Sequence, residues 1–372
     1  MESALGWVDD LFHLFGREPP PNLNLYIALV VILVPLPIVF LFVRSARPRQ
    51  GIVPPYRERV LILGASSGVG EELALQYSQR GCRNLILVAR RADELAKVKA
   101  KCDERRKEGE EWEQSQEAPG WEKVGETVTT ITADCTKPED LLKIRQLVRK
   151  TMGGLDTLHI VFGASALRSV LGTAGIDPVT SSQPLTPANA HATLEGITQT
   201  MTSARKILDV NAAATAGIMV TFIPLLQLSS PAPAAVLMSS VAALVPPPTR
   251  GLYAGSKAAQ MQIFQTAALE AKAQSEHATK TGQAHRASVK CFVLAPGTIR
   301  TDFRLSAVDG PIDASIRDAS WDQAANKKGG SSDLLEVGEV AHDAIRGADR
   351  MAEGVKIIPA KYKLVRFAQL LV

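Results

Sequence analysis

The chain has 372 residues, a length that suits one large α/β domain or two smaller ones. Its 46% of hydrophobic residues is typical of a globular protein with a large core. The 42 lysines and arginines almost balance the 38 aspartates and glutamates, so the net charge of +4 argues against a nucleic-acid-binding protein. The four cysteines lack the spacing of a zinc site or a disulfide framework, so we expect no metal and reduced thiols in a cytosol-facing body.

The first part of the chain has the pattern of a membrane anchor. Residues 1–24 mix apolar and acidic side chains, which suits either a patch on a membrane surface or a disordered tail. Residues 25–43 are apolar without one charge, close to the roughly 20 residues that cross a bilayer. Three arginines close this run, at Arg44, Arg47 and Arg49. By the positive-inside rule, the rest of the chain then lies in the cytosol.

The topology of the anchor has two alternatives. Pro35 and Pro37 interrupt the helical hydrogen bonds of the apolar run, so the segment is either a kinked single span or a hairpin in one leaflet. We expect the endoplasmic reticulum membrane, whereas a hairpin would suit the monolayer of a lipid droplet. Residues 44–56 are rich in proline and glycine and are predicted to be a linker, followed by a folded domain over residues 57–372.

Beyond the linker, short apolar runs alternate with helical patterns. The runs that predict buried strands are Val60–Leu63, Leu85–Ala89, Thr127–Ala133, Thr157–Phe162, Ala234–Met238, Val289–Leu294 and Val355–Ile358. This alternation predicts a doubly wound parallel sheet with right-handed crossovers, the Rossmann fold. Three polar or Gly-rich stretches, 103–125, 172–193 and 302–333, are expected to be exposed, the last as a mobile lid over the substrate.

The residues that carry chemistry centre on a tyrosine and a lysine. Tyr253 and Lys257 stand four apart and share one face of a helix, where an ammonium lowers the pKa of a phenol. Such a tyrosine passes a proton to or from a carbonyl oxygen. The pair alone more often forms a solvated or packed helix face. It gains weight from Ser240, thirteen positions upstream, from Asn211, and from the glycine-rich stretch Gly64–Gly70.

The glycine-rich stretch, Asn211, Ser240 and the Tyr253–Lys257 pair follow one another in the order found in the short-chain dehydrogenase/reductase family, which the chain resembles over roughly residues 57 to 305. Within this region, Gly64–Arg91 is most similar to hydroxysteroid-dehydrogenase-like members of the family. The resemblance implies that Tyr253 is the general acid/base and that Ser240 binds the substrate oxygen, with Ser239 as the alternative. It also implies that Lys257 lowers the pKa of Tyr253 and binds the nicotinamide ribose, while Asn211 holds a relay water.

The chain departs from the family pattern in two places. Leu63 precedes Gly64 where the family has threonine, and Phe162-Gly163-Ala164-Ser165 replaces the Asn-Asn-Ala-Gly stretch that ties strands together. The second departure puts local stability and the geometry at the cofactor ribose in doubt.

The end of the second predicted strand indicates which dinucleotide binds. An NAD site needs an acid there and an NADP site a cation. Arg90 and Arg91 follow Leu85–Ala89, and Asp93 lies too far into the next helix, so we expect NADP(H), with Arg90 as the first choice. Two solvent-facing arginines at a helix start are the alternative. Asp134 matches the adenine-contacting aspartate of the family, or it is a plain helix cap.

The full expected cofactor site comprises Gly64, Ser66, Ser67, Gly68, Val69, Gly70, Arg90, Arg91, Asp134, Gly163, Tyr253, Lys257, Pro296, Gly297, Ile299 and Thr301. The resemblance and the anchor together predict an NADP(H)-dependent oxidoreductase for a lipophilic ketone or alcohol, such as a sterol, a keto-sphingoid base, an acyl-dihydroxyacetone phosphate or a retinoid. The alternative is a non-catalytic scaffold or NADP(H) sensor at a lipid surface. The family often pairs through helices like those expected around 211–228 and 253–275, so a homodimer is expected.

Overall fold

A computed structural model describes residues 49–114, 128–179, 184–309 and 334–362. The predicted anchor 25–43, the tail 1–24 and most of the expected lid therefore lie outside the described residues. Within the described part, one helical stretch, Leu194–Ser229, is long and apolar enough to cross a membrane, but 56% of its most apolar window is buried inside the protein. That burial is typical of a core helix.

The centre of the fold is a seven-stranded sheet in the order β3-β2-β1-β4-β5-β6-β7, with every neighbouring pair parallel. The strands are β1 Arg59–Leu63, β2 Asn84–Ala89, β3 Val128–Thr132, β4 Thr157–Ile160, β5 Ala234–Met238, β6 Lys290–Pro296 and β7 Gly354–Ile358. The predicted doubly wound parallel sheet is confirmed. The strand order reverses between β1 and β4, the place where such sheets bind ligands.

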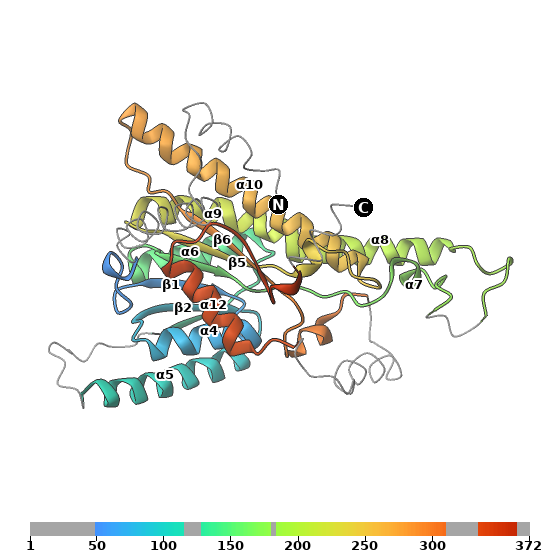
Figure 1. Cartoon of the computed structure of the whole chain (residues 1–372), viewed down its shortest axis with the longest axis horizontal. Coiled ribbons are helices and arrows are strands. Elements are labelled where there is room, and N and C mark those ends of the chain that lie inside the picture. Colours follow the sequence, from blue (N-terminus) through green and yellow to red (C-terminus); the bar gives the residue numbers. More distant parts are fainter. Residues whose placement is uncertain (1–48, 115–127, 180–183, 310–333, 363–372) are drawn as a thin grey trace, which may run out of the picture. The chain divides into compact units, whose positions relative to one another are not determined.

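Helices cover both faces of the sheet (Figure 1). Side chains alternate along each strand, so Val60 and Ile62 of β1 pack on one face while Leu61 and Leu63 pack on the other. The first face carries α4, α5 and α12, and the second carries α6, α9 and α10. The helices are α4 Gly68–Gln79, α5 Ala92–Gln114, α6 Pro138–Met152, α7 Val170–Thr173, α8 Leu194–Leu208, α9 Ala214–Ser229, α10 Gly251–Thr281 and α12 Val337–Asp349.

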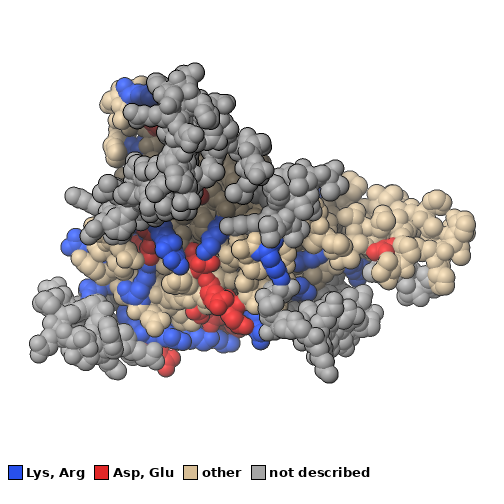
Figure 2. Space-filling model, in the orientation of Figure 1, with Lys and Arg blue, Asp and Glu red and all other residues tan. Residues whose placement is uncertain are grey.

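Four short helical turns lie between the main elements of the part that the structure describes. A π-helical turn, η2 Asp209–Ala213, joins α8 to α9, and a 3-10 turn, η4 Asp302–Ser306, follows β6. Another 3-10 turn, η3 Val241–Ala243, follows β5, and η1 spans Arg49–Gly51. Insertions of π-helix often occur at functional sites. Basic and acidic side chains lie side by side over the face drawn in Figure 2, as expected from the small net charge.

The prediction of an exposed loop over residues 103–125 is wrong for residues 103–114. The charged stretch 103–125 was expected to be an exposed excursion, but α5 continues through it to Gln114. Lysine, arginine and glutamate are good helix formers, and pairs such as Lys99–Asp103, four residues apart, further support the helix. A run of charged residues therefore did not indicate the absence of regular structure here.

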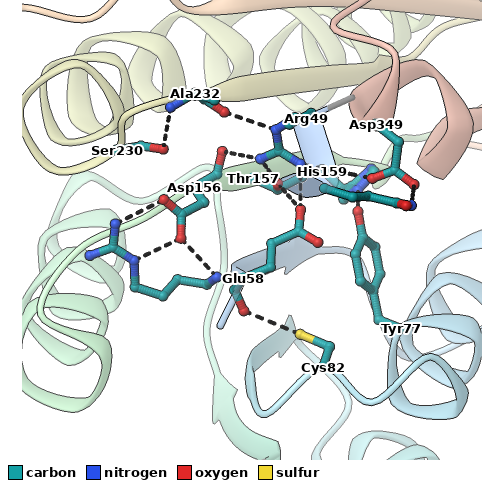
Figure 3. Close-up of polar contacts among 12 residues, drawn as sticks. Arg49, Glu58, Tyr77, Cys82, Asp156, Thr157, His159, Ser230, Ala232 and Asp349 are labelled. Carbon is teal, nitrogen blue, oxygen red and sulfur yellow. Dashed lines mark hydrogen bonds and ion pairs between the residues drawn. The ribbon is translucent and has the colours of Figure 1, made fainter. Parts of the chain in front are cut away.

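The compact unit begins at Arg49, earlier than the boundary at residue 57 expected from the sequence. Arg49 is 1% exposed and lies where the strands begin (Figure 3). Its guanidinium donates to Glu58 Oε1 at 2.7 Å, to Thr157 Oγ1 at 2.7 Å and to the Ala232 carbonyl at 2.8 Å. Glu58 also pairs with Arg80. Arg49 was expected to flank a membrane segment, but its charge is buried in the folded body.

A buried histidine next to this cluster makes stability depend on pH. His159 Nε2 lies 2.8 Å from the Tyr77 hydroxyl, and burial, helped by Arg80 and Arg49, lowers its pKa to about 3. The unfolded chain binds a proton near pH 6.5, so stability is full above that pH and falls as the pH drops towards 3, by up to about 1.4 kcal/mol per pH unit. We expect His159→Gln to flatten this slope between pH 6.5 and 5 in urea titrations, with exposed His342→Gln as the control. An unchanged slope in His159→Gln would contradict the assignment.

Candidate active site

A cavity of about 1250 Å³ lies at the carboxyl ends of the strands. Every residue that the sequence predicted for the cofactor site lines it, as do Ser239 and Ser240. This is the edge where doubly wound sheets bind ligands, and the cavity exceeds the roughly 300–1,000 Å³ of typical small-molecule sites. It is thus large enough for a dinucleotide and a second molecule together.

The turn after β1 requires its glycines. Gly64 has φ +100°, and a Cβ there would lie 2.6 Å from the Phe162 nitrogen. A Cβ on Gly70 would lie 2.0 Å from the Gly64 carbonyl oxygen, so the start of α4 packs directly on the turn. The first backbone N–H groups of α4 have no partners within the helix. A helix start of this kind, lining a cavity, suits a pyrophosphate.

An arginine bridges the glycine-rich turn. Arg91 Nη2 donates to Ser66 Oγ at 3.1 Å and to Ser67 Oγ at 2.9 Å. Arg90 was the first choice for the cation at this end, and it also lines the cavity. The structure nevertheless places Arg91, not Arg90, against the two serines. Asp134 lines the same end. Its Oδ1 accepts from the Thr136 backbone nitrogen at 3.0 Å, in the turn before α6, whereas the N-cap of α6 is Lys137, so Asp134 is not the helix cap and its contact with adenine stays a prediction.

Tyr253 and Ser240 meet at the other end of the cavity. Tyr253 lies in the first turn of α10, and Ser240 follows β5. Burial raises the pKa of Tyr253, while the Arg250 charge and a hydrogen bond with Ser240 act to lower it. Ser239 Oγ is buried and has no hydrogen-bond partner among the described residues. Of the two serines weighed from the sequence, Ser240 is the one that reaches Tyr253.

Lys257 lies one helical turn beyond Tyr253 and is 3% exposed. Its Nζ donates to Gln260 Oε1 at 2.8 Å and to the Met238 carbonyl at 3.2 Å, and burial lowers its pKa to about 7. Lys257 was expected to be the cation that lowers the pKa of Tyr253. In the structure, Arg250 lies over the phenol ring instead, with Cζ 4.1 Å from the ring centroid.

Asn211 is buried and does not line the cavity. Its Oδ1 accepts from the Ala164 nitrogen at 2.8 Å, and its Nδ2 donates to the Ala164 carbonyl at 3.0 Å and to Ser256 Oγ at 2.9 Å. The side chain therefore ties the loop after β4 to α10, and both of its N–H groups are used. This tie stabilises the stretch Phe162–Ser165, where the sequence departs from the family pattern.

Sequence reasoning missed a hydrogen-bond chain that links Lys257 to Asn211. Gln260 accepts from Lys257 and donates to Thr215 Oγ1 at 3.1 Å, and Thr215 donates to the Asn211 carbonyl at 2.8 Å. Gln260 and Thr215 are fully buried. The available signal was a glutamine three residues after Lys257, on the same helix face.

The segment after β6 closes the cavity over the glycine-rich turn. Thr301 Cγ2 lies 3.3 Å from where a Cβ on Gly68 would stand, and the Gly297 nitrogen donates to the Ile358 carbonyl at 2.7 Å. A Cβ on Gly163 would lie 3.1 Å from Asn211 Oδ1 and 3.3 Å from Lys257 Nζ. The backbone thus approaches the cavity closely from both sides, as a bound dinucleotide requires.

Comparison with known proteins agrees with this geometry. A family model described as short chain dehydrogenase matches residues 58–310. The chain belongs to the short-chain dehydrogenase family. Members of this family are oxidoreductases that act on alcohol or carbonyl groups with a nicotinamide cofactor. The predicted family is confirmed.

The relatives of this short-chain dehydrogenase include hydroxysteroid-dehydrogenase-like proteins at low identity. It is 28% identical to 11-beta-hydroxysteroid dehydrogenase-like 3 of Arabidopsis thaliana, over 73% of this chain and 72% of that protein. It is 30% identical to 11-beta-hydroxysteroid dehydrogenase 1A of the same plant, over 58% of this chain but only 48% of that protein. Among solved structures, an alcohol dehydrogenase from Thermococcus sibiricus, complexed with 5-hydroxy-NADP, shares the fold with a TM-score of 0.52 and 17% identity, over 82% of this chain and 97% of that one.

Proposed function

We propose that this protein is a membrane-anchored, NADP(H)-dependent oxidoreductase that interconverts a carbonyl and an alcohol on a lipophilic substrate. The observation that supports it best is the convergence of Tyr253, Ser240 and Lys257 on the cavity that also holds the glycine-rich turn. The nicotinamide supplies or accepts the hydride when bound. The residues of the chain bind the substrate, orient its carbonyl group and transfer the proton.

In the direction of reduction, the substrate oxygen is held between the Tyr253 and Ser240 hydroxyls. Burial raises the pKa of Tyr253, so its phenol is protonated at neutral pH and ready to donate. The proton leaves Tyr253 Oη for the substrate oxygen, and the Ser240 hydroxyl holds that oxygen in place. Lys257, on the next turn of α10, would hold the cofactor ribose, and its ammonium would give a proton back to the Tyr253 phenolate. The amine would then take up a proton from solvent. Gln260 and Thr215 fix the position of its ammonium.

The preference for NADP(H) rests on Arg91. Its guanidinium already lies against Ser66 and Ser67, which suits a phosphate on the adenosine ribose. We expect Arg91→Ala to weaken NADPH binding about 10- to 100-fold, the worth of a charge-assisted contact, and to change NADH binding little. Calorimetric titrations of both nucleotides measure this, with Arg90→Ala as the matched variant. Equal affinity of the unaltered protein for both nucleotides would contradict the proposal.

The lipophilic substrate is supported by one wall of the cavity and by the apolar run 25–43. Val241, Ala242, Val245 and Pro246–Pro248 form an apolar surface beside Tyr253. A membrane anchor raises the effective concentration of a lipid substrate near this wall.

The anchor and its orientation have their own test. We expect external protease to digest residues 57–372 in intact microsomes, because the arginines after the apolar run keep that part in the cytosol. Extraction with carbonate should leave the protein in the membrane fraction. A body that stays protected until detergent is added would overturn the orientation.

A further inference from the structure

Arg250 lies against the proposed proton donor, and the reaction described above gives it no part. It is the N-cap of α10, with its Cζ 4.1 Å from the centre of the Tyr253 ring. A cation over the face of an aromatic ring is attracted by that ring, and a positive charge nearby favours the phenolate over the neutral phenol. Phe303 packs edge-on against the same ring, with the centroids 6.1 Å apart, so a side chain of η4 also holds the phenol in place.

The loop after β4 orients the guanidinium. Arg250 Nη2 donates to Ser165 Oγ at 2.8 Å, and Arg250 Nε donates to the Ala166 carbonyl at 3.3 Å. Ser165 is fully buried and ends the stretch Phe162–Ser165, where the sequence departs from the family pattern. The departure therefore includes the hydroxyl that fixes Arg250 over Tyr253.

The backbone before α10 sets the position of Arg250 as well. Thr249 has φ 63°, in the left-handed region that a β-branched residue rarely adopts. Pro246–Pro248 precede it, and each proline fixes its own φ. Strained backbone of this kind persists only where the surrounding structure holds it, and it is common beside functional sites. The place of Arg250 is thus built into the loop and does not depend on the side chain alone.

Lys257 does not offer the same charge where Tyr253 ionises. Its Nζ donates to Gln260 Oε1 and to the Met238 carbonyl, and burial lowers its pKa to about 7. Burial raises the pKa of Tyr253 above its ordinary value, so Lys257 is neutral before the phenol ionises. Burial lowers the pKa of Arg250 too, but an arginine stays charged at pH values where a buried lysine has lost its proton.

Two further charged groups act on this pair. Arg304, in η4, lines the cavity, and its charge acts to lower the pKa of Tyr253, after the larger effects of Arg250 and the Ser240 hydrogen bond. Asp309 acts on Arg250 through its charge. A test of Arg250 therefore has to measure the effect of Arg304 beside it.

We propose that Arg250 is a positioning residue of the reaction: fixed by Ser165, its charge over the ring holds Tyr253 ready to give up its proton. The inference rests on the proposed carbonyl reduction. Arg250 exchanges no proton itself. The Tyr253 proton goes to the substrate oxygen, the guanidinium stabilises the phenolate that remains, and Lys257 is left to hold the cofactor ribose and to return the proton.

The test follows the ionisation of Tyr253 without a substrate. The NADPH-loaded, full-length protein is prepared with fluorotyrosine, whose phenol is more acidic than that of tyrosine, and is titrated with base by fluorine NMR. The signal missing from Tyr253→Phe belongs to this residue. Arg250→Gln should move its midpoint up by about one pH unit, a tenfold change in the ionisation constant. Arg250→Lys keeps a charge and should move it less, and Arg149→Gln, an exposed arginine of α6, should leave it unchanged.

The outcomes separate this inference from the proposed function. Ser165→Ala should give part of the shift, and it takes the place of Arg250→Gln if that variant does not fold. An unmoved midpoint, or equal shifts in Arg250→Lys and Arg250→Gln, would overturn the inference. A larger shift in Lys257→Met or Arg304→Gln would assign the role to that residue and would overturn it too. Because the titration needs no turnover, a shift found in a protein that reduces no carbonyl leaves the placement of Arg250 standing while the proposed function fails.

Discussion

Replacing Tyr253 with phenylalanine is expected to reduce turnover about 10²- to 10⁴-fold, the usual contribution of a positioned general acid. The ring stays, so its contacts with Phe303 and Arg250 survive, and only the hydroxyl that meets Ser240 is lost. NADPH affinity should be nearly unchanged, because the substitution leaves the glycine-rich turn and Arg91 unaltered. Steady-state NADPH oxidation and calorimetric titration give the two readouts.

The neighbouring serines serve as the matched pair for this experiment. Ser240→Ala removes the hydroxyl that bonds to Tyr253, so it should also lower turnover strongly, whereas Ser239→Ala removes a hydroxyl without a hydrogen-bond partner among the described residues. A Tyr253→Phe protein that keeps most of its activity would show that another group donates the proton. A Ser239→Ala protein as slow as Ser240→Ala would contradict the choice of Ser240 over Ser239.

The second large effect is expected on stability, at the opposite end of the sheet. Arg49→Ala leaves the Glu58 carboxylate buried at 1% exposure with Arg80 as its remaining ionic partner. Breaking a buried ion pair in this way costs about 3–5 kcal/mol, and Arg80 places this case near about 3 kcal/mol. The free energy of unfolding from urea titration measures the loss.

The control for Arg49 lies eight positions along the same segment. Arg57 is exposed and its guanidinium lies over the Tyr56 ring, so Arg57→Ala should change the free energy of unfolding by less than about 0.5 kcal/mol. If Arg49→Ala unfolds at the same urea concentration as the Arg57 variant, the segment before β1 is not part of the folded body.

The sequence predicted those parts of the site that depend on local backbone. The glycine-rich turn could be recognised because its glycines stand in one short stretch between a predicted strand and a predicted helix. A Cβ on Gly70 would meet the backbone of Gly64 in that same stretch, whereas the crowding of Gly64 by Phe162 involves a distant part of the chain. Tyr253 and Lys257 were found because helical spacing alone puts them on one face. Ser240 followed from its place at the end of an apolar strand, since parallel strands end at one edge of a sheet.

What the sequence did not predict depends on contacts between distant elements. Gln260 and Thr215 meet only because α10 packs against the start of α9, and neither residue belongs to a motif. Arg49 reaches Thr157 and Ala232 across more than a hundred positions, so its burial could not be read from the Pro- and Gly-rich stretch around it. Arg250 was not predicted as a site residue because it belongs to no motif. Its effect on Tyr253 depends on its guanidinium lying over the phenol ring, which only the structure shows.

The hydrogen bonds around Asn211 indicate a different role for this residue than the one expected from the sequence. Asn211 Nδ2 donates one hydrogen bond to the Ala164 carbonyl, in the loop after β4, and one to Ser256 Oγ. The side-chain amide therefore positions that loop and does not donate to a water. Its carbonyl already accepts from Thr215. Lys257 is thereby connected, through Gln260 and Thr215, to η2, whose Val210 lines the cavity.

The central claim is that this cavity transfers a hydride from NADPH to a carbonyl carbon while Tyr253 protonates the oxygen. The most direct measurement incubates the full-length protein with NADPH that carries deuterium at both hydrogens of the reactive nicotinamide carbon, together with a panel of lipophilic ketones, and analyses the alcohols by mass spectrometry. We expect one deuterium at the new carbinol carbon with the unaltered protein and almost none with Tyr253→Phe. Tight NADPH binding without deuterium in any product would contradict the account.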